Sequence, residues 1–216
     1  PVDAREWRPS SEGGEVPRVA EGRAPALPSS PGQKDRYRRI LRAAAEHGAT
    51  YGFDRIQMLD VAKDAGVAIA TLYRYFPSKT MLFTALLHSQ VERLDRVAAE
   101  VRPGQAPADA VAQVLVGASR RLLERPLLAQ AMLQSNNATV AGESPTMAVT
   151  GAFADLILRV AGVDAPTDHD LRLVRLVEQT WYGVLISELN GHIDAEESEG
   201  DTVLACRLLL ADLGTT

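Results

Sequence analysis

The feature that most restricts the fold is a pair of short helical patterns on either side of one glycine. The segments 58–65 and 68–76 each repeat apolar residues at helical spacing, with Gly66 between them. Ala62 is small enough to let a second helix cross the first closely, and Gly66 can adopt the left-handed backbone of a tight turn. The residues that can pack the two helices together are Val61, Ala65, Val67, Leu72 and Phe76. The spacing fits a helix-turn-helix, and it also fits an ordinary helical hairpin.

The remainder of the chain is predicted to be helical as well. Glycines and prolines divide it, and no run alternates convincingly between apolar and polar residues as a half-buried strand would. The first helix starts near Gln33 and is expected to end at His47-Gly48 and Gly52. Further helices are predicted at about 79–101, 107–124, 126–136, 145–161, 167–189 and 195–213. The predicted fold class is therefore all-α.

The charges are distributed unevenly along the chain, whose net charge is −5. Residues 34–80 carry nine Lys or Arg against five acids, whereas residues 81–216 carry ten against eighteen. A basic module on an acidic body suggests that only the module meets a polyanion, although a small excess of this kind also arises by chance. Residues 1–33 hold six of the twelve prolines and few large apolar residues. We predict a mostly disordered tail there.

The run Thr71–Lys79 closely resembles the signature of the TetR family of bacterial transcriptional regulators. The resemblance covers about 50 residues, from the helix 39–45 forward to Leu82 and Ala85. It implies a homodimeric repressor with a three-helix DNA-binding domain at residues 34–80, which contains one helix-turn-helix. It also implies a helical C-terminal domain at residues 81–216, which binds a ligand and dimerises through its last two helices. The single cysteine and the lack of an apolar signal segment predict separately that the chain is cytoplasmic. The expected partners are a palindromic double-stranded DNA operator and a hydrophobic small-molecule effector.

The side chains of the signature predict which residues meet DNA. If Leu72 and Phe76 pack inward, the other face of the second helix points outward. Ser78 can cap the next helix, where the free amides and the charge of Lys79 favour a phosphate. Hydroxyl groups can bind phosphate oxygens, and Arg74 can reach either a phosphate or a guanine edge. The predicted DNA contacts are Gln57, Met58, Ile69, Ala70, Thr71, Tyr73, Arg74, Tyr75 and Lys79.

Three positions depart from the pattern of the family. Ala68 stands where the family often has a serine that caps the recognition helix. Ile69-Ala70 replaces a more usual polar or glycine-containing pair, and these apolar side chains can touch a thymine methyl group but cannot form hydrogen bonds with bases. The sequence therefore predicts DNA binding without identifying the residues that read bases.

The C-terminal body contains few aromatic residues and many aliphatic ones, which is typical of an apolar pocket, although methionine on a helix is more often ordinary core. The predicted ligand contacts are Arg120, Met132, Asn136, Met147, Phe153, Trp181, Tyr182 and Leu185. The helix 167–189 is apolar on more than one face, which fits a position between a core and a partner subunit. Several segments, including 67–79 and 125–128, resemble actinobacterial regulators of steroid catabolism, which respond to sterol-derived coenzyme A thioesters. Another hydrophobic effector, such as an acyl-CoA or an antibiotic, is the alternative.

We expect no catalytic residue, metal or cofactor. His169 lies between Asp168 and Asp170, but adjacent residues on a helix point in different directions and do not form a metal site. Cys206 lies among leucines and is expected to act as a small hydrophobic residue. No phosphate-binding loop, nucleophile elbow or dinucleotide fingerprint occurs, and no apolar run reaches the roughly 18 residues of a membrane span.

Two functions remain open from the sequence. The first is a ligand-responsive DNA-binding repressor. The second is a helical small-molecule-binding or catalytic protein whose helix-turn-helix is only structural. The polar and charged residues on one face of the second short helix favour the first function, because packing alone does not require them.

Overall fold

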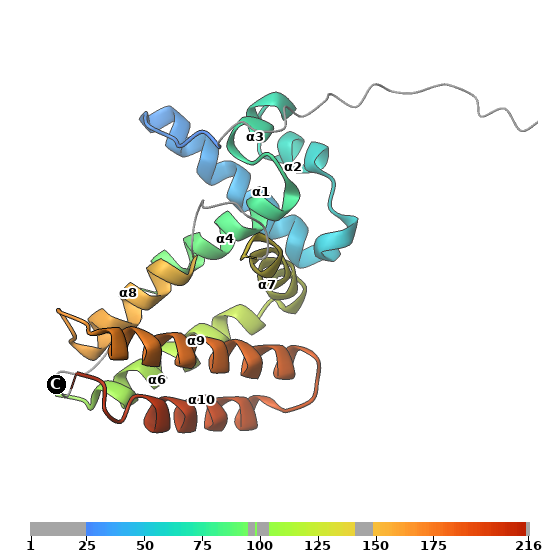
Figure 1. The fold of residues 1–216 in the computed structure, drawn as a ribbon. Helices are drawn as coiled ribbons and strands as arrows, with labels where there is room; N and C mark the ends of the chain where they lie inside the picture. The colour runs from blue at the N-terminus through green and yellow to red at the C-terminus, as the bar shows by residue number, and fades with distance from the viewer. Residues whose placement is uncertain (1–24, 95–97, 99–103, 141–148, 215–216) are drawn as a thin grey trace, which may run out of the picture.

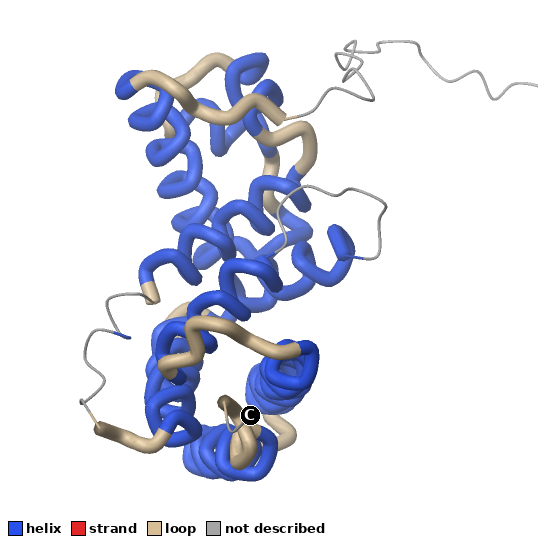
Figure 2. The backbone as a smooth tube through the Cα atoms, turned by 60° about the vertical axis from the view of Figure 1, so that its left-hand side comes forward, coloured by secondary structure: helices blue, strands red, loops and turns tan. Residues whose placement is uncertain are grey.

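The protein is described from a computed structural model that covers residues 25–94, 98, 104–140 and 149–214. These residues form helices and loops, with no strand among them (Figure 2). The helices are α1 (Pro31–Arg55), α2 (Met58–Asp64), α3 (Ile69–Tyr75), α4 (Lys79–Arg93), α6 (Pro107–Leu123), α7 (Pro126–Val140), α8 (Val149–Ala161), α9 (Asp168–Leu189) and α10 (Ala195–Leu209). The all-α prediction is confirmed. Within the described ranges, no helix is long and apolar enough to cross a membrane.

Short polar side chains set the starts of several helices. Ser30, Thr167 and Asp194 each form a capping box with the side chain three residues later, at the start of α1, α9 and α10. The Ser78 hydroxyl accepts a hydrogen bond from the Met81 amide at 3.1 Å, so Ser78 caps α4 as predicted. The start of α3 has no such bond, since its N-cap is an alanine.

The helices form two groups, α1–α4 with α7 and α6 with α8–α10, which meet where α4 packs against α8 and α7 packs against α6. Figure 1 shows α1, α2 and α3 at one end of the molecule and the antiparallel pair α9 and α10 at the other, with α4 leading from the first group toward the second. Helix α7 packs against both α1 and α4, and α10 packs against α6 and α9. One continuous hydrophobic core runs through both groups, and it includes Ile40 in α1, Phe83 in α4 and Leu115 in α6. The two groups are therefore joined by continuous packing of side chains.

Helix α1 continues through His47-Gly48, the first of the two places that the sequence predicted for its end. A Cβ atom on Gly48 would lie 2.7 Å from Leu128 Cδ1 and 2.8 Å from Phe83 Cε1. The glycine is therefore needed for the close approach of α1 to α4 and α7, and it does not terminate the helix. The helical path breaks at the second predicted place, Gly52, with φ 69° and ψ 172°, shortly before α1 ends.

Other predicted boundaries also differ from the structure. Helix α1 begins at Pro31, within the predicted tail, and the Ala26 amide donates a hydrogen bond to the Arg74 carbonyl at 3.0 Å. The part of the tail at 25–33 is therefore held against the helices. Helix α7 extends to Val140, and α10 stops at Leu209, after which the chain forms turns. Residues 1–24 and the predicted helix ends at 99–101 and 145–148 lie outside the described residues.

Candidate functional site

Helices α2 and α3 meet at a turn with the geometry of a helix-turn-helix. Gly66 has φ 63°, the left-handed backbone that the sequence predicted. Val61 and Leu72 are completely buried between the helices. The Arg39 side chain of α1 donates from Nη1 to the Ala65 carbonyl at 2.8 Å. Arg39 of α1 thus gives a hydrogen-bond partner to a carbonyl at the end of α2 and holds the turn against α1.

One face of α3 remains available at the surface. Ala70 and Arg74 are exposed and lie one helical turn apart, while Thr71 and Tyr73 are half-buried. Ile69 packs partly against the core, and Gln57 is exposed at the start of α2. Six predicted DNA contacts at the start of α2 and on α3 are therefore exposed or half-buried in the structure. They are Gln57, Ile69, Ala70, Thr71, Tyr73 and Arg74.

Two predicted DNA contacts, Met58 and Tyr75, are buried, and this prediction is corrected. Their side chains are only 9% and 2% exposed. Met58 packs into the core, and the Tyr75 ring meets the Tyr37 ring edge-on, with 5.8 Å between centroids. The Arg74 guanidinium carbon lies 5.1 Å from the centroid of the Tyr75 ring, and Arg74 Nη2 donates to the Tyr75 hydroxyl at 3.4 Å. The buried Tyr75 ring therefore holds the Arg74 guanidinium group in a fixed orientation.

Lys79 was predicted to contact a DNA phosphate. In the structure its ammonium group faces the end of α1 instead. Lys79 Nζ donates to the Phe53 carbonyl at 2.7 Å, lies 3.4 Å from the Ile56 carbonyl and sits 4.4 Å from the centroid of the Phe53 ring. Carbonyls at the end of a helix lack partners within the helix. The charge therefore caps α1 and joins it to the start of α4.

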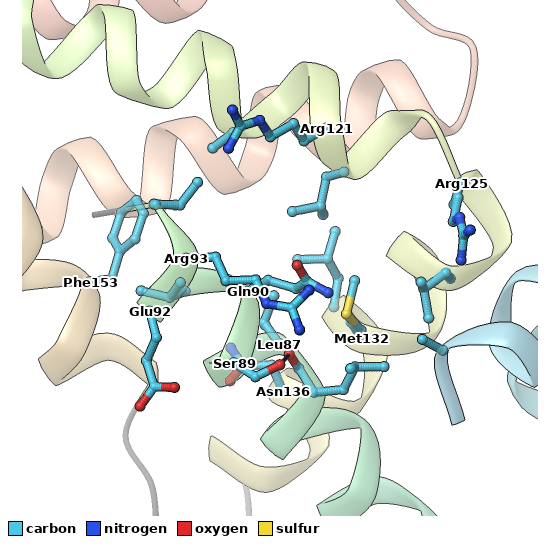
Figure 3. A pocket seen from close by; sticks show the side chains of 18 of the residues that line it. Leu87, Ser89, Gln90, Glu92, Arg93, Arg121, Arg125, Met132, Asn136 and Phe153 are labelled. Carbon is cyan, nitrogen blue, oxygen red and sulfur yellow. Dashed lines mark hydrogen bonds between the residues drawn. The ribbon is translucent and has the colours of Figure 1, made fainter. Parts of the chain in front are cut away.

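A cavity of about 1320 Å³ lies between the two groups of helices. Its walls come from α1, α4, α6, α7, α8 and α9. Figure 3 shows Gln90, Arg93 and Met132 in the middle of this region, with Phe153 and Arg125 on opposite sides. The predicted ligand contacts that line the cavity are Met132, Asn136, Phe153, Trp181 and Tyr182.

Aromatic residues form the α8–α9 side of the cavity. The Trp181 and Phe153 rings are stacked, with 5.0 Å between centroids and 8° between planes. Trp181 Nε1 donates to the Ser119 hydroxyl at 2.8 Å, and the Asn137 side chain donates to the Tyr182 hydroxyl. These bonds hold both aromatic side chains of α9 in fixed orientations.

Two predicted ligand contacts among the described residues, Arg120 and Leu185, do not line the cavity. Arg120 Nη2 donates to Glu199 Oε2 of α10 at 2.7 Å, because its neighbour Arg121 occupies the cavity face of α6. Leu185 of α9 is completely buried in the protein and is not part of the cavity wall. Met147 lies outside the described residues.

Helices α1 and α4 also line the cavity, although no residue in either helix was among the predicted ligand contacts. Arg38 and Arg42 of α1 contribute to the wall, and Arg125 Nη1 lies 3.0 Å from Oε1 of Glu46, which is also in α1. In total, six arginines and four glutamates line the cavity. The helical spacing of Arg38, Leu41, Arg42 and Ala45 indicated one shared face, but no local signal indicated what that face would meet.

One of the cavity glutamates, Glu178 of α9, is half-buried. Burial raises the pKa of its carboxyl group to about 7, because removal of water penalises the charged form. No hydrogen bond or ion pair joins Glu178 to any residue that the structure describes. The cavity therefore combines an apolar wall with both cationic and carboxyl groups.

Comparisons with known families match both parts of this arrangement. Residues 40–86 match the profile of "Bacterial regulatory proteins, tetR family", which covers the helix-turn-helix and the start of α4. Residues 104–209 match "Tetracyclin repressor-like, C-terminal domain", which covers most of the cavity wall outside α1 and α4. The chain belongs to the TetR family.

Individual relatives agree with this membership. The chain is 32% identical to the HTH-type transcriptional repressor KstR of Rhodococcus jostii, over 85% of this chain and 87% of that protein. It is 30% identical to KstR of Mycobacterium tuberculosis, over 85% and 84% of the two chains. A solved TetR transcriptional regulator from Rhodococcus sp. RHA1 has 46% identity and a TM-score of 0.77, over 86% of this chain and 100% of that one. As a TetR-family protein, the chain is a DNA-binding transcriptional regulator and not an enzyme.

Proposed function

We propose that this TetR-family protein is a cytoplasmic repressor that binds a palindromic operator as a homodimer and releases it when a hydrophobic effector fills the cavity. The observation that carries the proposal is that the cavity is lined by α1 and α4, the two helices that hold the helix-turn-helix in place. A ligand in this cavity touches the DNA-binding part of the molecule directly. The KstR relatives are named repressors, which supports the direction of regulation.

The proposed contact with the operator uses the exposed face of α3. Arg74 offers a guanidinium group, which can bind a phosphate or both acceptors of a guanine edge. The hydroxyl groups of Thr71 and Tyr73 can bind phosphate oxygens, and Ala70 can touch a thymine methyl group. Because Tyr75 orients Arg74 from beneath, the guanidinium group loses less conformational freedom on binding.

The proposed dimer interface uses the outer faces of α9 and α10. Leu176 of α9 and Leu204 and Leu208 of α10 are 38%, 55% and 69% exposed, an unusual exposure for leucines that lie on neighbouring helices. Packing these helices against their copies would form a four-helix bundle. Leu185 of α9 is buried within the monomer and does not belong to this face.

The cavity supports a large, mostly apolar effector that also carries negative charge. Its apolar walls can bind such a molecule by burial of surface, and its arginines can bind carboxylate or phosphate groups. A sterol-derived or acyl coenzyme A thioester has both properties, and the resemblance to regulators of steroid catabolism points to the sterol-derived type. Release follows if the effector binds the form unable to hold DNA more tightly than the DNA-bound form.

Binding to the duplex upstream of the protein's own gene tests the DNA-binding part of the proposal. We expect Arg74→Ala to weaken binding by about 1–3 kcal/mol, measured by fluorescence anisotropy at several salt concentrations. Arg120→Ala is the matched control, because it removes the same charge from α6, where Arg120 pairs with Glu199. Equal losses in both variants, or no binding by the wild type to any duplex, would refute the assignment.

A further inference from the structure

Glu178 is the one half-buried carboxyl group on the cavity wall, and it has no partner among the described residues. Glu178 lies one helical turn before Trp181 and Tyr182 on α9, and all three side chains line the cavity. Trp181 and Tyr182 each have a hydrogen-bond partner on another helix, Ser119 and Asn137. Among the described residues, Glu178 has neither a hydrogen bond nor an ion pair.

The carboxyl oxygens of Glu178 are not among the fully buried, unpartnered polar atoms of the described residues, so they remain accessible from the cavity. The arginines that line the same cavity do not pair with Glu178, and burial alone raises its pKa. A ligand that displaces water from Glu178 must therefore supply a hydrogen-bonding group of its own, because an unpaired polar group costs free energy when it loses water.

We propose that Glu178 recognises a hydroxyl group on the otherwise apolar part of the effector, an inference that rests on the proposed effector-binding function of the cavity. A hydroxyl group can donate to an ionised carboxylate and can accept from a protonated carboxyl, so it pairs with Glu178 in either form. A carbonyl oxygen can only accept, and it therefore requires the protonated form.

Charged groups are poorer partners at this position. An amine on the ligand would enter a cavity in which six arginines outnumber four glutamates. A carboxylate or phosphate would be repelled by ionised Glu178, and it finds better partners among the arginines. The cavity is therefore expected to orient an amphipathic ligand. Its anionic end would lie at the arginines and its neutral hydroxyl group at Glu178.

Two isomeric probes test this assignment without DNA. 1-Dodecanol and 1-methoxyundecane have the same number of atoms, but only the alcohol can donate a hydrogen bond. Binding is followed by Trp181 fluorescence in a Trp7→Phe background, because these are the two tryptophans of the chain. We expect the wild-type cavity to bind the alcohol about fivefold to tenfold more tightly than the ether, the effect of one hydrogen bond.

Variants of Glu178 decide the origin of this preference. Glu178→Leu should abolish it, and Glu178→Gln should retain most of it, since the amide still donates and accepts. Both variants are expected to fold, because each removes a carboxyl group that burial disfavours. Glu124→Gln is the control, because it removes the same charge from an exposed position on the same cavity and should keep the preference.

Equal affinity of the wild type for both probes, a preference that survives Glu178→Leu, or no binding of the alcohol would each overturn the inference. Failure of the proposed repressor function gives a different result. In that case the probes would still be distinguished through Glu178, while no cavity ligand would change binding to the operator.

Discussion

Gly48→Ala adds one methyl group where α1, α4 and α7 meet. The new Cβ would lie 2.7 Å from Leu128 Cδ1 and 2.8 Å from Phe83 Cε1. Carbon atoms that are not bonded prefer separations of about 3.5–4.0 Å. Both neighbours are almost completely buried, so neither can swing into solvent. Either α1 moves away from α7, or Leu128 moves toward the cavity that it also lines.

The expected cost follows from two opposing effects. Forcing an extra methyl group into a packed core costs about 1–3 kcal/mol, whereas replacing glycine by alanine within a helix gains roughly 0.5–1 kcal/mol. The net expectation is a loss of about 0.5–2 kcal/mol in the free energy of unfolding. Gly151→Ala in α8 is the matched control. Its Cβ meets no heavy atom of the described residues within 4 Å, so that variant should be more stable than the wild type.

Urea unfolding at one protein concentration measures the stability of Gly48→Ala and of Gly151→Ala. Fluorescence anisotropy with the upstream duplex measures the DNA affinity of each variant. If α1 moves, Gly48→Ala should also weaken DNA binding in the absence of effector. Leu128→Ala makes room for the new methyl group, so the double variant should lose less stability than the sum of the two single variants. A Gly48→Ala protein as stable as Gly151→Ala, or additive costs in the double variant, would refute the proposed close contact.

Three further predictions concern charge and assembly. Glu178 has a folded-state pKa of about 7 against an ordinary 4.5, so its ionisation lowers stability as pH rises through this window. Glu178→Gln should therefore raise the free energy of unfolding by on the order of 1–3 kcal/mol near pH 8, allowing for partial exposure, and by progressively less toward pH 5 in urea titrations. Lys79→Ala should lower the melting temperature, while Lys63→Ala, an exposed position on α2, should not, because only Lys79 caps α1. Leu208→Glu should give monomers by light scattering with the helical content retained, and a stable dimer would exclude Leu208 from the interface.

Local chemistry was sufficient to predict the helix-turn-helix. Gly66 needs a left-handed backbone, Ser78 caps α4 through an amide three residues away, and Leu72 must face inward. Each of these features depends on residues within one or two helical turns. For the same reason, the starts of α2, α3, α6 and α9 were predicted to within one residue.

The errors arose where distant residues decide the outcome. Lys79 meets the Phe53 carbonyl 26 positions earlier, and Arg125 meets Glu46 at a separation of 79 positions. Gly48 was taken for a helix end because its packing against Leu128 cannot be seen from its neighbours in the sequence. The aromatic wall of the cavity was predicted from residue type, but its α1 wall depends on how the two groups of helices pack.

The central claim is that a ligand in the cavity controls binding to DNA, and one titration tests it most directly. A complex with the upstream duplex is titrated with sterol-derived and acyl coenzyme A thioesters while fluorescence anisotropy reports release. We predict that one of these compounds weakens DNA binding about 5- to 150-fold, which corresponds to a typical coupling of about 1–3 kcal/mol. Trp181→Ala should blunt this release while leaving DNA binding without effector intact, because Trp181 belongs to the cavity wall. A thioester that saturates the cavity without changing the affinity for DNA would contradict the account.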